Sequence, residues 1–110
     1  MEKIDKDLQE KIQQLQILEQ NLQQILMQKQ AFQFELNETE NALKEVKNTK
    51  GDVFKLTGQI MLKTSKEDVE KELSNKQELL KLRTKSIEKQ EANFKQEADK
   101  LREEVMKKIK

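Results

Sequence analysis

Apolar residues in the N-terminal part of the chain repeat with the seven-residue period of a coiled coil. Two interleaved series carry this pattern, namely Leu8, Leu15, Leu22, Lys29, Leu36 and Leu43, and Ile4, Lys11, Leu18, Ile25, Phe32, Thr39 and Val46. They correspond to the a and d positions that a partner helix must cover. Lys11, Lys29 and Thr39 interrupt the series, either as markers of the register or because lysine stems lie along the apolar surface. The pattern predicts a coiled-coil helix over residues 1–49.

A second helix is predicted to begin near Ser65, because Ser65 and Asp68 have the spacing of a capping box. One series of core positions at intervals of seven is apolar throughout: Leu73, Leu80, Ile87, Phe94 and Leu101. The companion positions are mostly polar or small, namely Gln77, Thr84, Glu91, Ala98 and Val105. We therefore expect a coiled-coil helix over residues 65–110 whose apolar interface is weaker than that of the first helix.

The segment between the helices, residues 50–64, has a different pattern. Two short apolar runs, Val-Phe-Lys-Leu and Ile-Met-Leu, flank a Thr-Gly-Gln turn, and this arrangement predicts a β-hairpin. Gly58 is expected at the positive-φ position of the turn, and Gly51 is expected to end the first helix. The two helices that the hairpin joins are expected to run antiparallel.

The apolar residues of this hairpin need a partner. A two-stranded hairpin is at best marginally stable in water, and its free edges offer unpaired backbone groups to another chain. We expect several subunits to join their hairpins into a closed sheet or barrel. The residues assigned to this oligomerisation surface are Val53, Phe54, Leu56, Gly58, Ile60, Met61 and Leu62. The predicted fold class is mainly α: one domain with two long antiparallel coiled-coil helices joined by a β-hairpin that assembles into an intersubunit β-barrel.

The composition agrees with long helices that lack a self-contained core. The 110 residues are 39% charged and 34% hydrophobic, whereas soluble domains average about 45–50% apolar residues. Proline is absent, and 22 basic residues nearly cancel 21 acidic ones. This balance gives no electrostatic reason to expect nucleic-acid binding. We interpret most of the charge as the solvated faces of a coiled coil rather than as catalytic groups.

The same composition excludes several kinds of chemistry. Without cysteine or histidine there is no zinc finger, disulfide, thiol nucleophile or imidazole base, and two glycines are too few for a Gly-rich phosphate loop. We therefore expect no enzyme activity, no metal and no cofactor. No apolar stretch is long enough to span a membrane, and the N-terminus lacks the apolar core of a signal peptide. The expected location is the cytoplasm, without membrane contact.

In an antiparallel pair the two chain ends meet and form the tip of the coiled coil. The apolar residues there, called the tip residues below, are Ile4, Leu8, Ile12, Leu101, Val105, Met106 and Ile109. One interpretation is that they only close the last turns of the coiled coil. The other is that they hold non-native polypeptides weakly at several points, with several arms together supplying the affinity. The pattern leaves both interpretations open.

Several segments together resemble beta-class prefoldin subunits of the archaeal type. They are ILMQKQ at residues 25–30, VFKLTG at 53–58, IMLK at 60–63, DVEKEL at 68–73 and LKLRTKSIEKQE at 80–91. The most specific of them are the strand-turn-strand motif between helices of similar length and the IEKQE stretch that begins at Ile87. A single hairpin resembles the beta class more than the alpha class.

This resemblance implies a fold and a function. It implies a hexamer of two alpha-class and four beta-class subunits, with a double β-barrel platform and six coiled-coil arms. It also implies ATP-independent capture of unfolded polypeptides by the tip residues, and delivery to a group II chaperonin. Contact with the chaperonin is implied for the basic C-terminal residues Lys107, Lys108 and Lys110. The alternative is a structural coiled-coil adaptor or tether, which would bind one specific helical partner instead of many unrelated clients.

Overall fold

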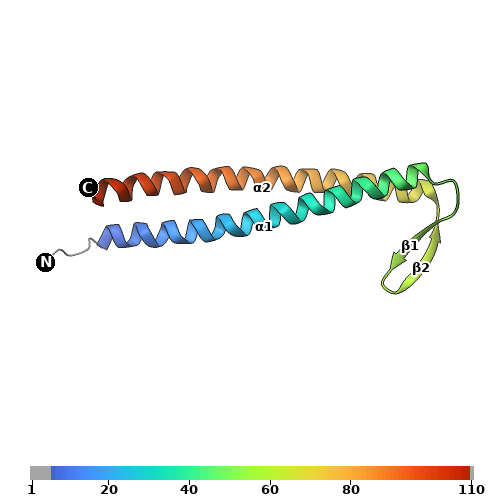
Figure 1. Ribbon diagram of the computed structural model, residues 1–110, viewed down its shortest axis with the longest axis horizontal. Helices are drawn as coiled ribbons and strands as arrows, with labels where there is room; N and C mark the ends of the chain where they lie inside the picture. The colour runs from blue at the N-terminus through green and yellow to red at the C-terminus, as the bar shows by residue number, and fades with distance from the viewer. Residues whose placement is uncertain (1–5, 110) are drawn as a thin grey trace. The chain divides into compact units, whose positions relative to one another are not determined.

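The structure, a computed structural model, describes residues 6–109 of the chain. In chain order its elements are helix α1 (Lys6–Asn48), strand β1 (Val53–Thr57), strand β2 (Ile60–Thr64) and helix α2 (Lys66–Ile109), as Figure 1 shows. The predicted fold of two long helices joined by a β-hairpin is confirmed. Contacts divide the described residues into two compact units, one of residues 6–30 with 86–109 and one of residues 31–85.

In the first unit the beginning of α1 lies beside the end of α2. Lys11 contacts Glu104 and Lys29 contacts Glu91, so residue numbers rise along one helix as they fall along the other, and the helices are antiparallel. The predicted core positions within this unit that the structure describes are all buried or partly buried. Ala98 has no exposed surface, and a residue this small at the contact allows the two helix axes to approach closely.

The second unit contains the remainder of both helices together with the hairpin. Leu80 is only 2% exposed, and Leu43 is also buried. Two threonines share the interface, and each hydroxyl donates to a carbonyl of its own helix: Thr39 Oγ1 to Glu35 O at 2.7 Å and Thr84 Oγ1 to Leu80 O at 2.8 Å. Their polar atoms are therefore satisfied, as buried polar groups in native proteins generally are. The companion positions of α2 are mostly polar or small and are expected from the sequence to contribute little to the interface. Thr84 shows that such a position can still be buried there.

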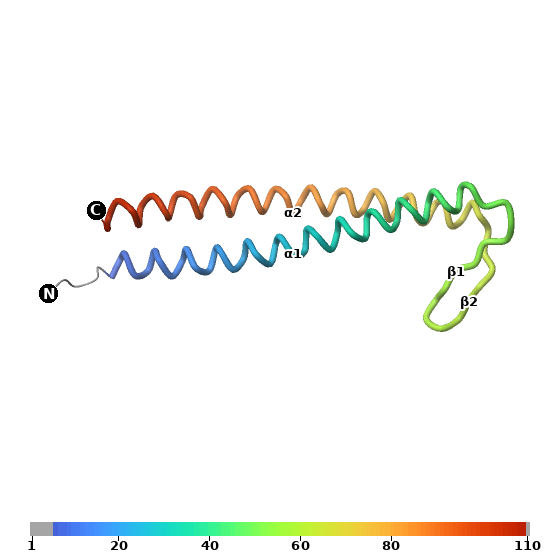
Figure 2. Tube along the Cα trace, in the orientation of Figure 1, coloured from blue at the N-terminus to red at the C-terminus, as the bar shows by residue number. Residues whose placement is uncertain are grey.

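The hairpin turns through Gly58 and Gln59, and Figure 2 follows the chain through it. β1 and β2 pair antiparallel, with Thr57 opposite Ile60 at the turn. Gly58 has a φ of 62°, and no other residue within 6–109 has a positive φ. In a type II′ turn the first of the two central residues has a positive φ and the second does not, which is the pattern seen here. This turn type suits the twist of antiparallel strands. The predicted role of Gly58 is confirmed.

α1 ends at Asn48, and the prediction that Gly51 ends it is wrong. Gly51 lies three residues beyond the helix and does not have a positive φ, which a glycine cap of this kind requires. The end is closed by Thr49, whose hydroxyl donates to the carbonyl of Glu45 at 2.6 Å. Lys66 also closes this end, because its Nζ donates to the carbonyl of Lys47 at 2.9 Å and to the carbonyl of Thr49 at 3.2 Å. A cation at this point complements the negative end of the helix dipole.

α2 begins with the cap that its sequence predicts. The backbone amide of Asp68 donates to Ser65 Oγ at 3.1 Å, and the amide of Val69 donates to the Ser65 carbonyl at 3.2 Å. The acidic residues Glu67 and Asp68 lie in the first turn, where negative charge complements the helix dipole. The start of α2 is therefore fixed by local hydrogen bonds directly after the hairpin.

Candidate functional site

The register of the hairpin places apolar side chains on both of its faces. Opposite residues of an antiparallel pair share a face, and successive residues along a strand point to opposite faces. One face carries Val53, Ile60 and Leu62, and the other carries Phe54, Leu56 and Met61. A single covering layer can bury only one of these two faces.

These side chains are largely uncovered in the single chain. Phe54 is 54% exposed, Leu56 67%, Ile60 63%, Met61 68% and Leu62 51%, whereas Val53 is partly buried. The polar contacts of the hairpin are exposed ion pairs, from Lys55 to Glu72 at 2.9 Å and from Lys63 to Asp52 at 3.6 Å. Contiguous apolar surface of this kind marks an interaction site, and a two-stranded sheet needs such cover to be stable.

The tip residues divide into a covered set and an exposed set. Val105 is buried, and Leu8, Ile12 and Leu101 are partly buried. Met106 is 55% exposed and Ile109 is 64% exposed. Ile4 lies outside the residues that the structure describes. The first unit therefore brings the described tip residues of both helices together, and among them only Met106 and Ile109 present most of their surface to solvent.

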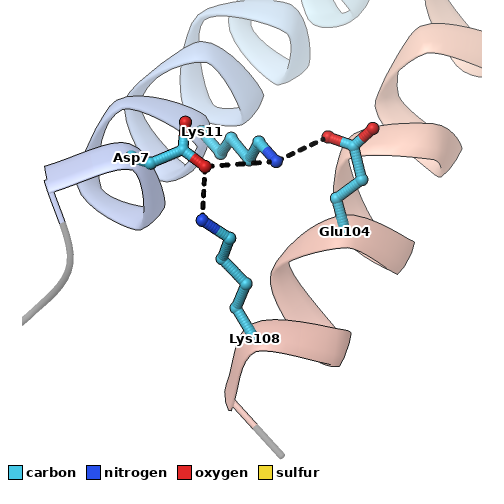
Figure 3. A network of polar contacts seen from close by, with 4 residues as sticks. All are labelled: Asp7, Lys11, Glu104 and Lys108. Carbon is cyan, nitrogen blue, oxygen red and sulfur yellow. Dashed lines mark hydrogen bonds and ion pairs between the residues drawn. The ribbon is translucent and has the colours of Figure 1, made fainter.

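A network of four charged residues joins α1 to α2 beside the tip residues (Figure 3). Lys11 Nζ lies 3.5 Å from Asp7 Oδ2, one turn earlier on α1, and 3.2 Å from Glu104 Oε2 on α2. Lys108 Nζ donates a hydrogen bond to the same Asp7 oxygen. Asp7 therefore binds a lysine from each helix, while Lys11 binds a carboxylate from each helix.

The network shifts the pKa of two of its members. The hydrogen bond from Lys108, helped by the positive charges of Lys108 and Lys11, lowers the pKa of Asp7, and desolvation opposes this. The hydrogen bond to Glu104, helped by the negative charges of Asp7 and Glu104, raises the pKa of Lys11, again against desolvation. Both shifts favour the charged forms of Asp7 and Lys11.

The basic residues at the end of α2 lie in different environments. Lys107 is exposed, whereas Lys108 is bound by Asp7. Lys110 lies outside the described part of the chain. A partner that binds Lys108 must therefore compete with Asp7, whereas one that binds Lys107 meets an exposed side chain.

Two further ion pairs cross between the helices of the first unit. Lys29 Nζ lies 3.2 Å from Glu91 Oε1, and both residues occupy core positions. Arg102 Nη2 lies 3.1 Å from Glu19 Oε1, while its Nη1 lies 2.9 Å from Asp99 Oδ1 in the same helix. The sequence pattern did not predict these cross-helix pairs, because a heptad identifies the positions that face a partner but not the residue opposite each one.

Apolar surfaces are the features that stand out in this chain. Across residues 6–109 no group of three or more acidic side chains is placed to hold a metal ion. No helix in that range is both long and apolar enough to cross a bilayer. The hairpin faces and the tip residues are the candidate functional sites because exposed apolar surface is suited to binding other polypeptides.

Comparisons with known proteins match nearly the whole chain. A family model described as prefoldin subunit matches residues 9–110. The chain is 32% identical over 111 residues to prefoldin subunit beta of Pyrobaculum aerophilum, covering 99% of this chain and 88% of that protein. It is 31% identical over 106 residues to prefoldin subunit beta of Saccharolobus islandicus, covering 94% of this chain and 84% of that protein.

A solved structure is similar over the same extent. The crystal structure of the prefoldin beta subunit from Thermococcus strain KS-1 superposes with a TM-score of 0.88 at 31% sequence identity. The match covers 97% of this chain and 96% of the other. Sequence and fold similarity therefore agree.

Proposed function

This chain belongs to the prefoldin subunit family, and from that premise we propose that it captures unfolded polypeptides without ATP and passes them to a group II chaperonin. Prefoldins are chaperones rather than an enzyme family, and membership implies assembly with other prefoldin subunits. The proposed complex is a cytoplasmic hexamer in which four beta-class copies of this chain join two alpha-class subunits. It needs no cofactor.

The observation that best supports this proposal is the hairpin with two uncovered apolar faces. In the proposed complex, residues 50–64 of each subunit pair through their free edges into β-barrels. One face of the hairpin then fills a barrel, and the other packs against a neighbouring layer, so that both are removed from water. Residues 1–49 and 65–110 form the coiled-coil arm that carries the tip residues.

The tip residues are the proposed surface for unfolded clients. Met106 and Ile109 are mostly exposed, and the flexible side chain of methionine adapts to partners of different shape. One arm offers a small contact area, so simultaneous contact with several arms supplies the affinity. Lys107 and Lys110 are the proposed contacts with the chaperonin, together with Lys108 once it leaves Asp7.

The test is to assemble the chain with an alpha-class subunit and to add two unrelated, chemically unfolded clients without ATP. Native mass spectrometry is expected to give a complex of two alpha-class and four beta-class subunits, and light scattering is expected to show less aggregation of both clients. Deleting residues 1–8 and 101–110 is expected to abolish this protection while the same number of subunits remains assembled. Undiminished protection would place client binding away from the tip residues.

Point variants test the same surface without shortening the chain. Met106→Gln combined with Ile109→Gln is expected to weaken protection of both clients. Leu82→Gln is the matched control, because Leu82 is 65% exposed on α2 but does not belong to the tip residues. The adaptor hypothesis predicts a different outcome, in which neither client is protected and one helical partner binds with a fixed stoichiometry.

A further inference from the structure

Two lysines continue the heptad series of the coiled coil at the end of the first unit, Lys11 as a partly buried residue and Lys108 as an exposed one. Lys11 belongs to the second core series of α1, and Lys108 follows Leu101 by seven residues in the apolar series of α2. Most other members of these series are apolar. Lys11 and Lys108 instead bind the carboxylates of Asp7 and Glu104 (Figure 3).

The contacts that close this end are therefore ionic to an unusual degree. Val105 is buried at 8% exposure, but Leu8 and Leu101 are only partly buried, and Met106 and Ile109 are mostly exposed. Ion pairs at a protein surface are individually weak and are screened by salt. Separation of the helices here requires less free energy than where leucines and isoleucines fill the core positions.

We propose that the four charged residues of Figure 3 form an ionic latch that holds the ends of α1 and α2 together. The latch controls access to the apolar side chains between them, Leu8, Ile12, Leu101 and Val105. When it is closed, a client reaches mainly Met106 and Ile109. When it opens, the covered residues join the binding surface. This inference rests on the proposed function, since it assigns a control to the client-binding tip.

The first unit also contains a matched control for the latch. Arg102 and Glu19 form a cross-helix ion pair at 3.1 Å, with side chains that are each 49% exposed. This pair does not involve a lysine at a core position, and Arg102 is held independently by Asp99. Glu19→Gln therefore removes a surface ion pair between the same two helices without altering the latch.

Two variants drive the latch in opposite directions. Asp7→Lys replaces the carboxylate that binds both lysines with a third positive charge, and it is expected to open the ends. Lys11→Leu combined with Lys108→Leu replaces the latch with an apolar core, and it is expected to keep the ends closed. Circular dichroism of the assembled complex is the control that checks whether each variant remains helical.

Distances at the helix ends provide the direct measurement. The chain contains no cysteine, so Gln9→Cys and Glu103→Cys introduce one spin label on each helix without competing thiols. Pulsed electron paramagnetic resonance is recorded on the assembled complex, with labelled chains diluted among unlabelled copies. In the otherwise unaltered chain, distances are expected to lengthen between about 0.1 M and 1 M salt, because the screening length falls from about 10 Å to 3 Å.

The variants separate the latch from general destabilisation. Asp7→Lys is expected to lengthen the distances at low salt and to increase client protection. The leucine pair is expected to abolish the salt response and to reduce protection, while Glu19→Gln changes neither. Distances that are unchanged in Asp7→Lys would overturn the latch, and so would equal effects of Asp7→Lys and Glu19→Gln. Longer distances with unchanged client protection would support the latch and contradict client binding at the tip.

Discussion

Lys29 Nζ lies 3.2 Å from Glu91 Oε1 at core positions on both helices, with 31% and 14% of the two side chains exposed. The first unit thus contains a partly shielded ion pair where the heptads would otherwise place apolar residues. A polar residue at such a position fixes the register of a coiled coil. We infer that this pair fixes the alignment of α1 with α2. Lys29, which interrupts the apolar series, therefore has a specific partner in Glu91 on the other helix.

Lys29→Leu is expected to destabilise the protein, because Glu91 would lose its partner on α1 and be left with the longer contact to Lys95 at 3.9 Å. The expected loss is about 1–3 kcal/mol, which is typical when a shielded polar group loses its partner. Thermal and urea unfolding of the assembled protein measure it. Adding Glu91→Leu to Lys29→Leu is expected to restore at least the original stability, since an apolar pair often replaces an ion pair without loss. Greater stability of the single variant would contradict a role in register.

Aspartate on either face of the hairpin is expected to dissociate the complex. Phe54→Asp tests one face and Ile60→Asp tests the other. Each variant removes one buried apolar side chain per subunit, and the assembly free energy that this side chain contributes is about 1.5–3 kcal/mol. Native mass spectrometry is expected to detect smaller species, while circular dichroism still reports helical arms. Gln59→Asp in the turn is the control and is expected to leave the complex intact. An intact complex with Phe54→Asp or Ile60→Asp would show that the altered face is not covered by a neighbour.

Gly58→Ala is expected to weaken the hairpin by about 1–2 kcal/mol, the usual cost of the left-handed conformation for an L-residue. A Cβ at Gly58 meets no atom within 4 Å, so the cost is conformational rather than steric. Gly51→Ala is the matched control, because Gly51 has equal space around it and no positive φ. It is expected to be neutral or slightly stabilising. Denaturation of the assembled complex measures the stability of both variants. Equal losses of stability in Gly58→Ala and Gly51→Ala would argue against a type II′ turn.

The four-residue network is expected to hold the helix ends over a defined pH range. Because the pKa of Asp7 is lowered in the folded chain, its contribution is complete above the unfolded-state pKa of about 3.9. That contribution is lost as pH falls through the lower folded value. Because the pKa of Lys11 is raised, its contribution is complete below about 10.4 and is lost as pH rises through the higher folded value.

Spin-label distances between Gln9→Cys and Glu103→Cys are therefore expected to be constant near neutral pH and to lengthen at both extremes. Asp7→Asn is expected to reduce the acid transition, and also to weaken the alkaline one because the Asp7 carboxylate contributes to the raised pKa of Lys11. Distances that do not change with pH would show that the network does not hold the ends together.

Much of the fold follows from local rules. The core positions counted by sevens are buried or partly buried, Gly58 takes the positive φ of the turn, and Ser65 caps α2. Each of these depends on residues close together in the sequence. The helix predicted over residues 1–49 ends close to the observed Asn48, but the prediction that Gly51 stops it is wrong, because the closure involves Lys66, a residue beyond the hairpin.

The candidate site was less predictable than the fold. The apolar tip residues and hairpin residues could be named from the pattern, but their exposure could not. Val105 is buried whereas Met106 beside it is exposed, and this difference depends on how the two helices face each other. The partners of Lys11 and Lys29 likewise depend on the alignment of residues far apart in the chain.

The two-faced hairpin also bears on the order in which the protein matures. Local helical contacts form quickly, whereas a pair of short strands with both faces in water gains its stability only when other subunits arrive. In the proposed complex, completion of folding therefore depends on subunit concentration. Until assembly, the unpaired strand edges make a newly synthesised copy of this chain prone to aggregation. An unassembled subunit is thus itself in need of the protection that the finished complex is proposed to give.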